Sequence, residues 1–320
     1  AIDIALWDLA GQAAKEPIYN MLGGRCREKI RTYNTIGSYG PYQDNEWELR
    51  DPVGLARSYL DEGITMMKAY YLMPVAQATG GDFLAEKDLR AALEPLEKIR
   101  NALGSHIEIA HDGGGAWALP NAIKIAQAME EYDVFWQEEL LRPVNVETHL
   151  RLAQATKTPI CAAERLISKY HFREFIEKGA AEIVMPDIIW TGGITETKKI
   201  AALAETYQTP IAPHDWTGPV NVFACAHISL ACPNLMVQET NRAYYKGWYD
   251  RFIEPNIAVK DGFILPPEGP GLGTRLKKDV RDRPDATVEV TDEAAEWNGP
   301  GFIDPGQTVP HVFMPRVPEK

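Results

Sequence analysis

Short apolar segments alternate with longer amphipathic segments along most of the chain. The apolar segments are rich in β-branched and aromatic residues, as buried strands are. Between them, segments such as 86–104 place Leu89, Leu93 and Leu96 on one helical face. The alternation predicts parallel strands joined by crossover helices, so that helices cover the sheet. The expected strands are IRTYNTI near residue 30, TMMKAYY near residue 65, IEIAHD ending at 112, VFWQEE ending at 139, PICAAE ending at 164, EIVMPD ending at 187, PIAPHD ending at 215 and LMVQE ending at 239.

Eight strands with their helices predict an α/β barrel, which takes about 250 residues. The chain has 320 residues. We expect the barrel to cover residues 25–265, after a helix and linker in residues 1–24. Ile2, Leu6 and Leu9 follow helical spacing from the start, which indicates that further sequence precedes them. Residues 266–320 are rich in Gly, Pro and charge, and they predict a meandering segment outside the barrel.

Polar residues end six successive strands at nearly constant spacing. They lie 26, 26, 23, 27 and 25 residues apart, which is about the length of one strand plus one helix: Asp112, Glu138, Glu164, Asp187, His214 and Glu239. Functional side chains of such barrels come from the carboxyl ends of different strands, so these six residues should converge at one mouth. Acids that merely end strands or cap helices are the alternative reading.

Composition excludes several classes of partner. The net charge of −12, without a block of Lys or Arg, argues against nucleic acid. No apolar run approaches the roughly 20 residues of a membrane span. The four cysteines form no CxxC pair, which is typical of reduced thiols in a cytoplasmic protein.

Three of the strand-end residues are candidate metal ligands. Asp112, Glu138 and Glu164 form an all-oxygen set without Cys or His, which suits a hard cation and favours Mg²⁺. Glu139 is an alternative to Glu138, because side chains alternate along a strand and only one of the two can point into the mouth.

Other strand-end residues are candidates for moving protons and binding the substrate. Asp187 can orient the His214 imidazole as a general acid or base. Lys68 and Tyr70 are two residues apart and face the same way, so Lys68 could hold a substrate carboxylate and lower the phenol pKa of Tyr70. Lys68 as a core lysine that extends toward solvent is the alternative.

The remaining strand-end residue, Glu239, would lie near the same carboxylate and could donate a hydrogen bond if burial keeps it protonated. A helix-capping or salt-bridged Glu239 is the alternative. Together with the metal and Lys68, Glu239 would stabilise the negative charge that forms when a proton leaves the carbon beside the substrate carboxylate.

The chain resembles the enolase superfamily, mandelate racemase subgroup, over residues 1–280. The opening AIDIALWDLAGQAAKEPIYNMLGG resembles the segment between that family's capping domain and barrel. WQEEL resembles its W-(I/Q)-E-E-P strand, ICAAERL its A-A-G-E strand, and MPDIIWTGGITE, APHDWTGP and GPGLG match further family segments. The resemblance implies a (β/α)7β TIM-like barrel, with most of the N-terminal α+β capping domain absent from this chain.

The resemblance also implies roles for the strand-end residues. Asp112, Glu138 and Glu164 would bind Mg²⁺, Asp187 and His214 would form a dyad, and Glu239 would be an electrophilic partner. Family members commonly form dimers or octamers, so a homo-oligomer is expected.

Two departures from the family pattern bear on the reaction. Many members have Lys-x-Lys on the second strand, where this chain has Lys68-Ala69-Tyr70, so dehydration is favoured over racemisation by two bases. After Asp112 come three glycines, residues 113–115, in place of larger polar residues, so we expect the site to be roomy there.

We therefore expect a lyase that removes the α-proton of a sugar acid, an aldonate or aldarate, and eliminates water from the β-position to give a 2-keto-3-deoxy acid. His214 and Tyr70 are the expected proton carriers, in an undetermined direction. The alternatives are a racemase, epimerase or lactone cycloisomerase of a hydroxy acid, and a metal-binding protein without catalysis. The expected partners are a small sugar-acid substrate and Mg²⁺, with no nucleic acid and no membrane.

Overall fold

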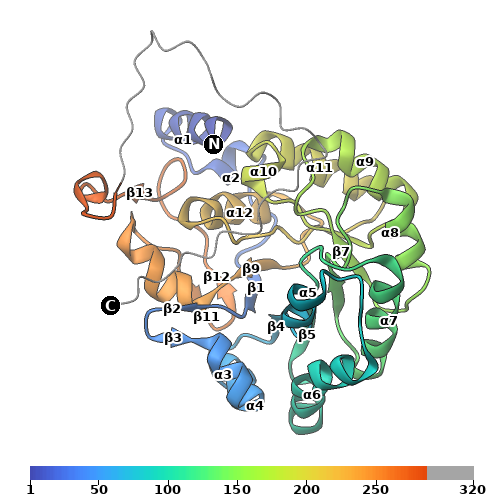
Figure 1. Ribbon diagram of the computed structural model, residues 1–320. Coiled ribbons are helices and arrows are strands. Elements are labelled where there is room, and N and C mark those ends of the chain that lie inside the picture. The colour runs from blue at the N-terminus through green and yellow to red at the C-terminus, as the bar shows by residue number, and fades with distance from the viewer. Residues whose placement is uncertain (287–320) are drawn as a thin grey trace. The chain divides into compact units, whose positions relative to one another are not determined.

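The computed structural model describes residues 1–286 (Figure 1). Contacts divide the chain into two units, residues 1–277 and 278–320. In the described part of the second unit, a 3-10 turn covers Val280–Asp282, and Arg283 forms an ion pair with Asp285 at 2.7 Å. The expected C-terminal segment falls largely outside the described residues, so its boundaries remain a prediction.

The first unit contains a sheet in which six parallel strands are paired in chain order. Its strands are β1 (Ile30–Thr35), β4 (Met66–Ala69), β5 (Glu108–Asp112), β6 (Trp136–Glu138), β7 (Ile160–Ala162), β8 (Ile183–Val184) and β9 (Gln238–Thr240). Because β9 pairs with β1 in parallel, the last strand of the series returns to the first.

The seventh expected strand, PIAPHD, is extended but is not a regular strand. Ile211 bridges Val184 on one side and Leu235 on the other, and a further bridge joins Asp187 to His214. Pro210 and Pro213 lack backbone N–H groups, which removes hydrogen bonds that a regular ladder would need. The segment still closes the sheet, and the fold is the (β/α)7β barrel.

Side-chain alternation separates the interior of the barrel from its rim. Apolar residues fill the interior as one cluster: Tyr33, Met66, Ala110, Trp136, Cys161, Ile183, Met185, Ala212 and Val237. Two residues further along most of these strands, the next inward position is polar, as at Lys68, Asp112, Glu138 and Glu239. The polar residues therefore lie at the carboxyl ends, above a packed apolar core.

Helices cover the outside of the sheet (Figure 1). They are α4 (Pro52–Asp61), α6 (Glu86–Leu103), α7 (Leu119–Met129), α8 (Val146–Ala153), α9 (Ser168–Lys178), α11 (Ile194–Thr206) and α12 (Pro219–Ala231). The predicted face of α6 is confirmed, because Leu89, Leu93, Leu96 and Ile99 are all buried. No helix in residues 1–286 is long and apolar enough to cross a membrane.

Two helices precede the barrel. In α1 (Ile2–Ala14), Trp7 Nε1 donates a hydrogen bond to Thr195 Oγ1 at 2.8 Å, which ties the helix to α11. The side chains of Ile2, Leu6 and Leu9 on α1 are exposed. The second helix, α2 (Ile18–Met21), is short.

The remaining strands and α-helices are short and lie in loops or at the sheet edge. They are β2 (Ser38–Tyr39), β3 (Tyr42–Gln43), α3 (Asp44–Arg50), α5 (Met73–Thr79), α10 (Ile188–Thr191), β10 (Ile253–Glu254), β11 (Val259–Lys260), β12 (Phe263–Ile264) and β13 (Arg275–Leu276). Strand β12 pairs antiparallel with the first half of β1.

Candidate active site

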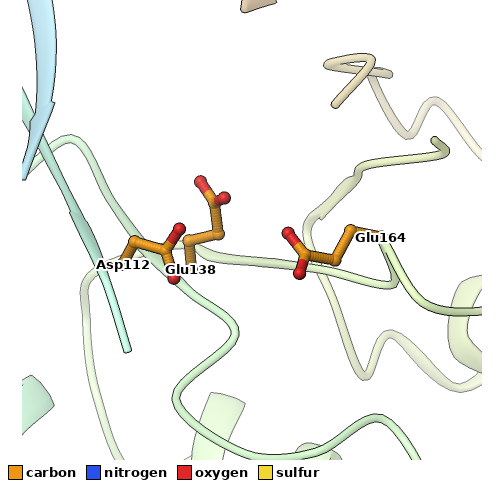
Figure 2. Close-up of side chains that lie close together, drawn as sticks. All are labelled: Asp112, Glu138 and Glu164. Carbon is orange, nitrogen blue, oxygen red and sulfur yellow. The ribbon is translucent and has the colours of Figure 1, made fainter. Parts of the chain in front are cut away.

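Three carboxylates from successive strand ends meet at the rim of the barrel. Asp112 ends β5, Glu138 ends β6, and Glu164 follows β7; each has an oxygen within 4.8 Å of an oxygen of both others. In Figure 2 the Glu164 side chain extends toward Asp112 and Glu138. This cluster includes Glu138 and not Glu139, which favours Glu138 as the candidate ligand.

Lys68 extends from β4 into the same group of charges. Its ammonium lies 3.3 Å from Asp112 Oδ2 and 2.9 Å from Glu239 Oε1, and it also contacts Glu138. The side chain is fully buried among carboxylates, which excludes a lysine that extends toward solvent. Burial opposes the charge of Lys68, but Glu138 and Glu239 raise its pKa well above the ordinary value.

Glu239 is ionised in this setting, which corrects the expectation of a protonated hydrogen-bond donor. Burial alone would raise its pKa, but the charges of Lys68 and His214 lower the pKa of Glu239 to about 2. Both of its oxygens accept hydrogen bonds, one from the Thr35 hydroxyl and one from the Asp215 backbone N–H at 2.8 Å. The alternative of a salt-bridged acid describes it better.

Tyr70 lies just after β4, among the charges of the cluster. We expected Lys68 to lower the phenol pKa of Tyr70, but the net shift of this pKa is upward. Burial and the negative charge of Asp112 raise the pKa of Tyr70 well above its ordinary value, and the opposing effect of Lys68 is smaller. Tyr70 is therefore a neutral phenol here, which can donate a proton.

Asp187 and His214 are adjacent at the rim. His214 Nδ1 lies 2.8 Å from Asp187 Oδ2, and its Nε2 lies 3.4 Å from Glu164 Oε2. Asp187 also begins α10, because its Oδ1 accepts the backbone N–H groups of Ile189 and Trp190. Burial disfavours the imidazolium, but Glu164, Glu239 and Asp187 raise the pKa of His214 well above its ordinary value.

The three clustered carboxylates fit a hard divalent cation. They offer only oxygen ligands, and all three residues are buried, where unpaired negative charges are costly. Burial first, and then neighbouring carboxylates, raise the pKa values of Glu138 and Glu164. Lys68 opposes the shift at Glu138, and His214 opposes it at Glu164. A bound cation would relieve this repulsion. The donor set suits a hard divalent ion such as magnesium.

The glycines at 113–115 do not leave the site roomy, contrary to expectation. A Cβ at Gly113 would lie 2.8 Å from the Cα of Leu140, and one at Gly115 would lie 2.6 Å from Nη1 of Arg165. Arg165 also donates a hydrogen bond to the Gly114 carbonyl at 3.1 Å and lies 3.2 Å from Glu164 Oε1. Neighbouring groups therefore fill the space that side chains would take.

Sequence reasoning missed three residues that hold the site side chains. Trp136 Nε1 donates to Glu138 Oε2 at 2.9 Å, the Thr35 hydroxyl donates to Glu239, and the Trp190 ring stacks on His214 with centroids 5.8 Å apart. Strand alternation could have found Trp136, because it lies two residues before Glu138 and faces the same way. Nothing in the local sequence indicates the stacking of Trp190.

Comparison with known proteins relates this chain to one family of enzymes. The family model described as "Enolase C-terminal domain-like" matches residues 53–280. The chain is 32% identical over 305 residues to a D-galactonate dehydratase of Ralstonia pickettii, an alignment that covers 93% of this chain and 75% of that protein. It is 29% identical to a D-xylonate dehydratase of Haloferax volcanii, covering 87% of this chain and 67% of that protein.

Solved structures show the same likeness. An enolase of the mandelate racemase subgroup from Agrobacterium tumefaciens is 40% identical, with a TM-score of 0.80, over 88% of this chain and 73% of that one. An enolase protein from Sargasso Sea environmental sequencing is 37% identical, with a TM-score of 0.83, over 90% of this chain and 75% of that one. With this barrel, this rim and these relatives, the chain belongs to the enolase superfamily, in its mandelate racemase subgroup.

Proposed function

We propose that this chain, an enzyme of the lyase class, dehydrates a sugar acid. The α C–H bond and the β C–O bond of the substrate break, the oxygen leaves as water, and the resulting enol tautomerises to a 2-keto-3-deoxy acid. The relatives named as D-galactonate and D-xylonate dehydratases support the class of substrate. The observation that carries the proposal is that His214 Nε2, a group able to move protons, lies 3.4 Å from the carboxylate of Glu164 in the candidate metal cluster.

The proposed cofactor is Mg²⁺, held by Asp112, Glu138 and Glu164. When bound, the metal supplies Lewis-acid stabilisation of the negative charge that develops on the substrate carboxylate as the α-proton leaves. The clustering of three buried carboxylates within 4.8 Å supports this assignment.

Lys68 is the proposed partner of the substrate carboxylate. Its buried ammonium is oriented by Glu239 at 2.9 Å, so its position is set before the substrate binds. Glu239 acts through Lys68, and as an ionised acid it does not donate a hydrogen bond to the substrate.

His214 and Tyr70 are the proposed proton carriers. One removes the α-proton as a base, and the other protonates the departing β-hydroxyl as an acid. Asp187 holds the His214 ring through Nδ1 at 2.8 Å, which leaves Nε2 to exchange the proton. The raised pKa of Tyr70 favours this residue as the acid and His214 as the base.

The test is incubation of aldonic and aldaric acids with the protein and Mg²⁺ in heavy water. A keto-acid assay and mass spectrometry follow the loss of water, and NMR follows deuterium at the α-carbon. We expect a keto acid from at least one substrate. An isomerised product that has lost no water and carries deuterium at the α-carbon would favour a racemase or epimerase. The absence of both water loss and α-deuterium uptake with every acid would reject enolisation.

Partial reactions then assign the two proton carriers. We expect His214→Asn and Tyr70→Phe each to lower the dehydration rate by about 10²- to 10⁴-fold, the range for a general acid or base. The variant that lacks only the acid should still exchange the α-proton with solvent, whereas the variant that lacks the base should not. Full activity in either variant would remove that residue from the mechanism.

A further inference from the structure

Glu139 is in contact with all three segments that carry the candidate metal ligands. It follows Glu138 directly, and its backbone carbonyl accepts the N–H of Gly115, in the loop after Asp112, at 2.5 Å. Its side-chain Oε1 accepts the backbone N–H of Ala163, the residue before Glu164, at 2.6 Å. The side chain is fully buried, so these contacts are shielded from competing water.

The two residues joined by this side-chain contact have unusual backbone conformations. Glu139 has φ of +39° and Ala163 has φ of +92°, a region that residues with a Cβ rarely adopt. Such conformations persist at functional sites only when surrounding contacts enforce them. The bond from Ala163 to Glu139 is such a contact, and it lies one residue from the ligand Glu164.

We propose that Glu139 is a positioning residue that sets the relative placement of Asp112, Glu138 and Glu164. Without its carboxyl oxygen, the buried N–H of Ala163 loses its partner and the backbone is free to leave its strained conformation. The direction of the Glu164 side chain then changes, and the three carboxylates no longer converge on one ion. The inference rests on the metal site of the proposed function. It gives Glu139 a different role, because Glu139 neither binds the metal nor moves a proton.

The test measures Mg²⁺ affinity by calorimetry in three variants of Glu139. We expect Glu139→Ala to weaken Mg²⁺ binding by about 10- to 100-fold, as loss of groups that orient metal ligands does. Glu139→Gln should bind Mg²⁺ within a few-fold of wild type, because the amide oxygen still accepts the Ala163 N–H. Glu139→Asp keeps the charge, but its side chain is one methylene shorter, so its carboxylate does not reach the Ala163 N–H. This variant should therefore behave like the alanine variant.

The same strand provides a matched control. Glu182 Oε2 accepts the backbone N–H of Ile160 at 2.8 Å, at the end of β7 opposite to Glu164. Glu182→Ala removes a similar carboxyl-to-backbone bond, so it should lower the melting temperature without changing Mg²⁺ affinity. A merely structural role for Glu139 predicts that both glutamates behave alike.

The outcomes separate this inference from the function it rests on. If wild-type protein binds no Mg²⁺, the proposed metal site fails, and the inference fails with it. If wild type binds Mg²⁺ and Glu139→Ala binds equally tightly, the inference alone is overturned. If circular dichroism shows that the alanine variant is unfolded, the Mg²⁺ affinity of Glu139→Asp becomes the test. Wild-type affinity in Glu139→Asp would overturn the inference.

Discussion

The imidazole of His214 and the carboxylate of Asp187 are joined by a hydrogen bond of 2.8 Å between Nδ1 and Oδ2, across two adjacent strand ends. This contact fixes the ring and directs its Nε2 toward Glu164. The other oxygen of Asp187 caps α10, so one side chain both orients the candidate proton carrier and begins a helix.

Asp187→Asn should separate these two roles. The amide oxygen can still cap α10, but the amide nitrogen would face Nδ1 and favour the wrong tautomer of His214. We expect kcat to fall by about 10³-fold or more, as in hydrolase triads with the same change. The melting temperature should stay close to that of wild type. Unchanged kcat on the identified substrate would show that the dyad does not take part in the reaction.

Asp112→Asn and Glu164→Gln should each weaken Mg²⁺ binding sharply while the fold survives, because each replaces a charged ligand by a neutral one of the same shape. Isothermal calorimetry measures the affinity, and circular dichroism measures the fold. Glu94→Gln is a suitable control, because Glu94 is an exposed partner of Lys98 on α6 and should leave Mg²⁺ binding unchanged. Equal affinity in all three variants would contradict the ligand assignment.

Ala163→Gly should stabilise the protein, although glycine usually destabilises. Ala163 has φ of +92°, which costs a residue with a Cβ about 1–2 kcal/mol, more than the roughly 0.5–1 kcal/mol of added chain entropy that glycine brings. We expect the free energy of unfolding in urea to rise by about 0.5–1 kcal/mol. Ala91→Gly, in the exposed part of α6, should lower it by about 1 kcal/mol. The same sign for both variants would refute the strain argument.

Folding stability should decrease in mild acid because of His227, a fully buried residue of α12. Its Nδ1 accepts the backbone N–H of Tyr19 and its Nε2 donates to the Leu272 carbonyl, so the ring must be neutral. Burial lowers the pKa of His227 from its ordinary 6.5 to about 4. Between pH 6.5 and pH 4 this histidine is protonated in the unfolded chain but neutral in the folded protein. The free energy of unfolding therefore falls as pH falls from about 6.5 to about 4, by up to about 3 kcal/mol.

The measurement is urea unfolding between pH 7 and pH 4 in wild type and His227→Asn. Asparagine can offer a donor and an acceptor but does not titrate, so the variant should lose much of this pH dependence. Parallel curves for the two proteins would show that His227 does not contribute it.

The strand-helix order and the inward residue of most strand ends could be predicted from sequence. The alternation of side chains along a strand, and the spacing of polar residues by one strand plus one helix, can both be read from the sequence. As that spacing implies, the structure pairs Asp112 with Glu138 and bridges Asp187 to His214. Local patterns could not choose between Glu138 and Glu139, because a strand end with positive φ no longer alternates regularly.

The sequence by itself determined the barrel, its family and the residues that gather at one rim, because these follow from periodicity and from motifs within single segments. Only the tertiary structure decided their charges and supports. The ionised state of Glu239, the raised phenol pKa of Tyr70, and the contacts of Arg165 and Glu139 all depend on groups from other strands. Electrostatic and hydrogen-bond energies are set by distances of a few ångströms, which the chain acquires only when the barrel closes.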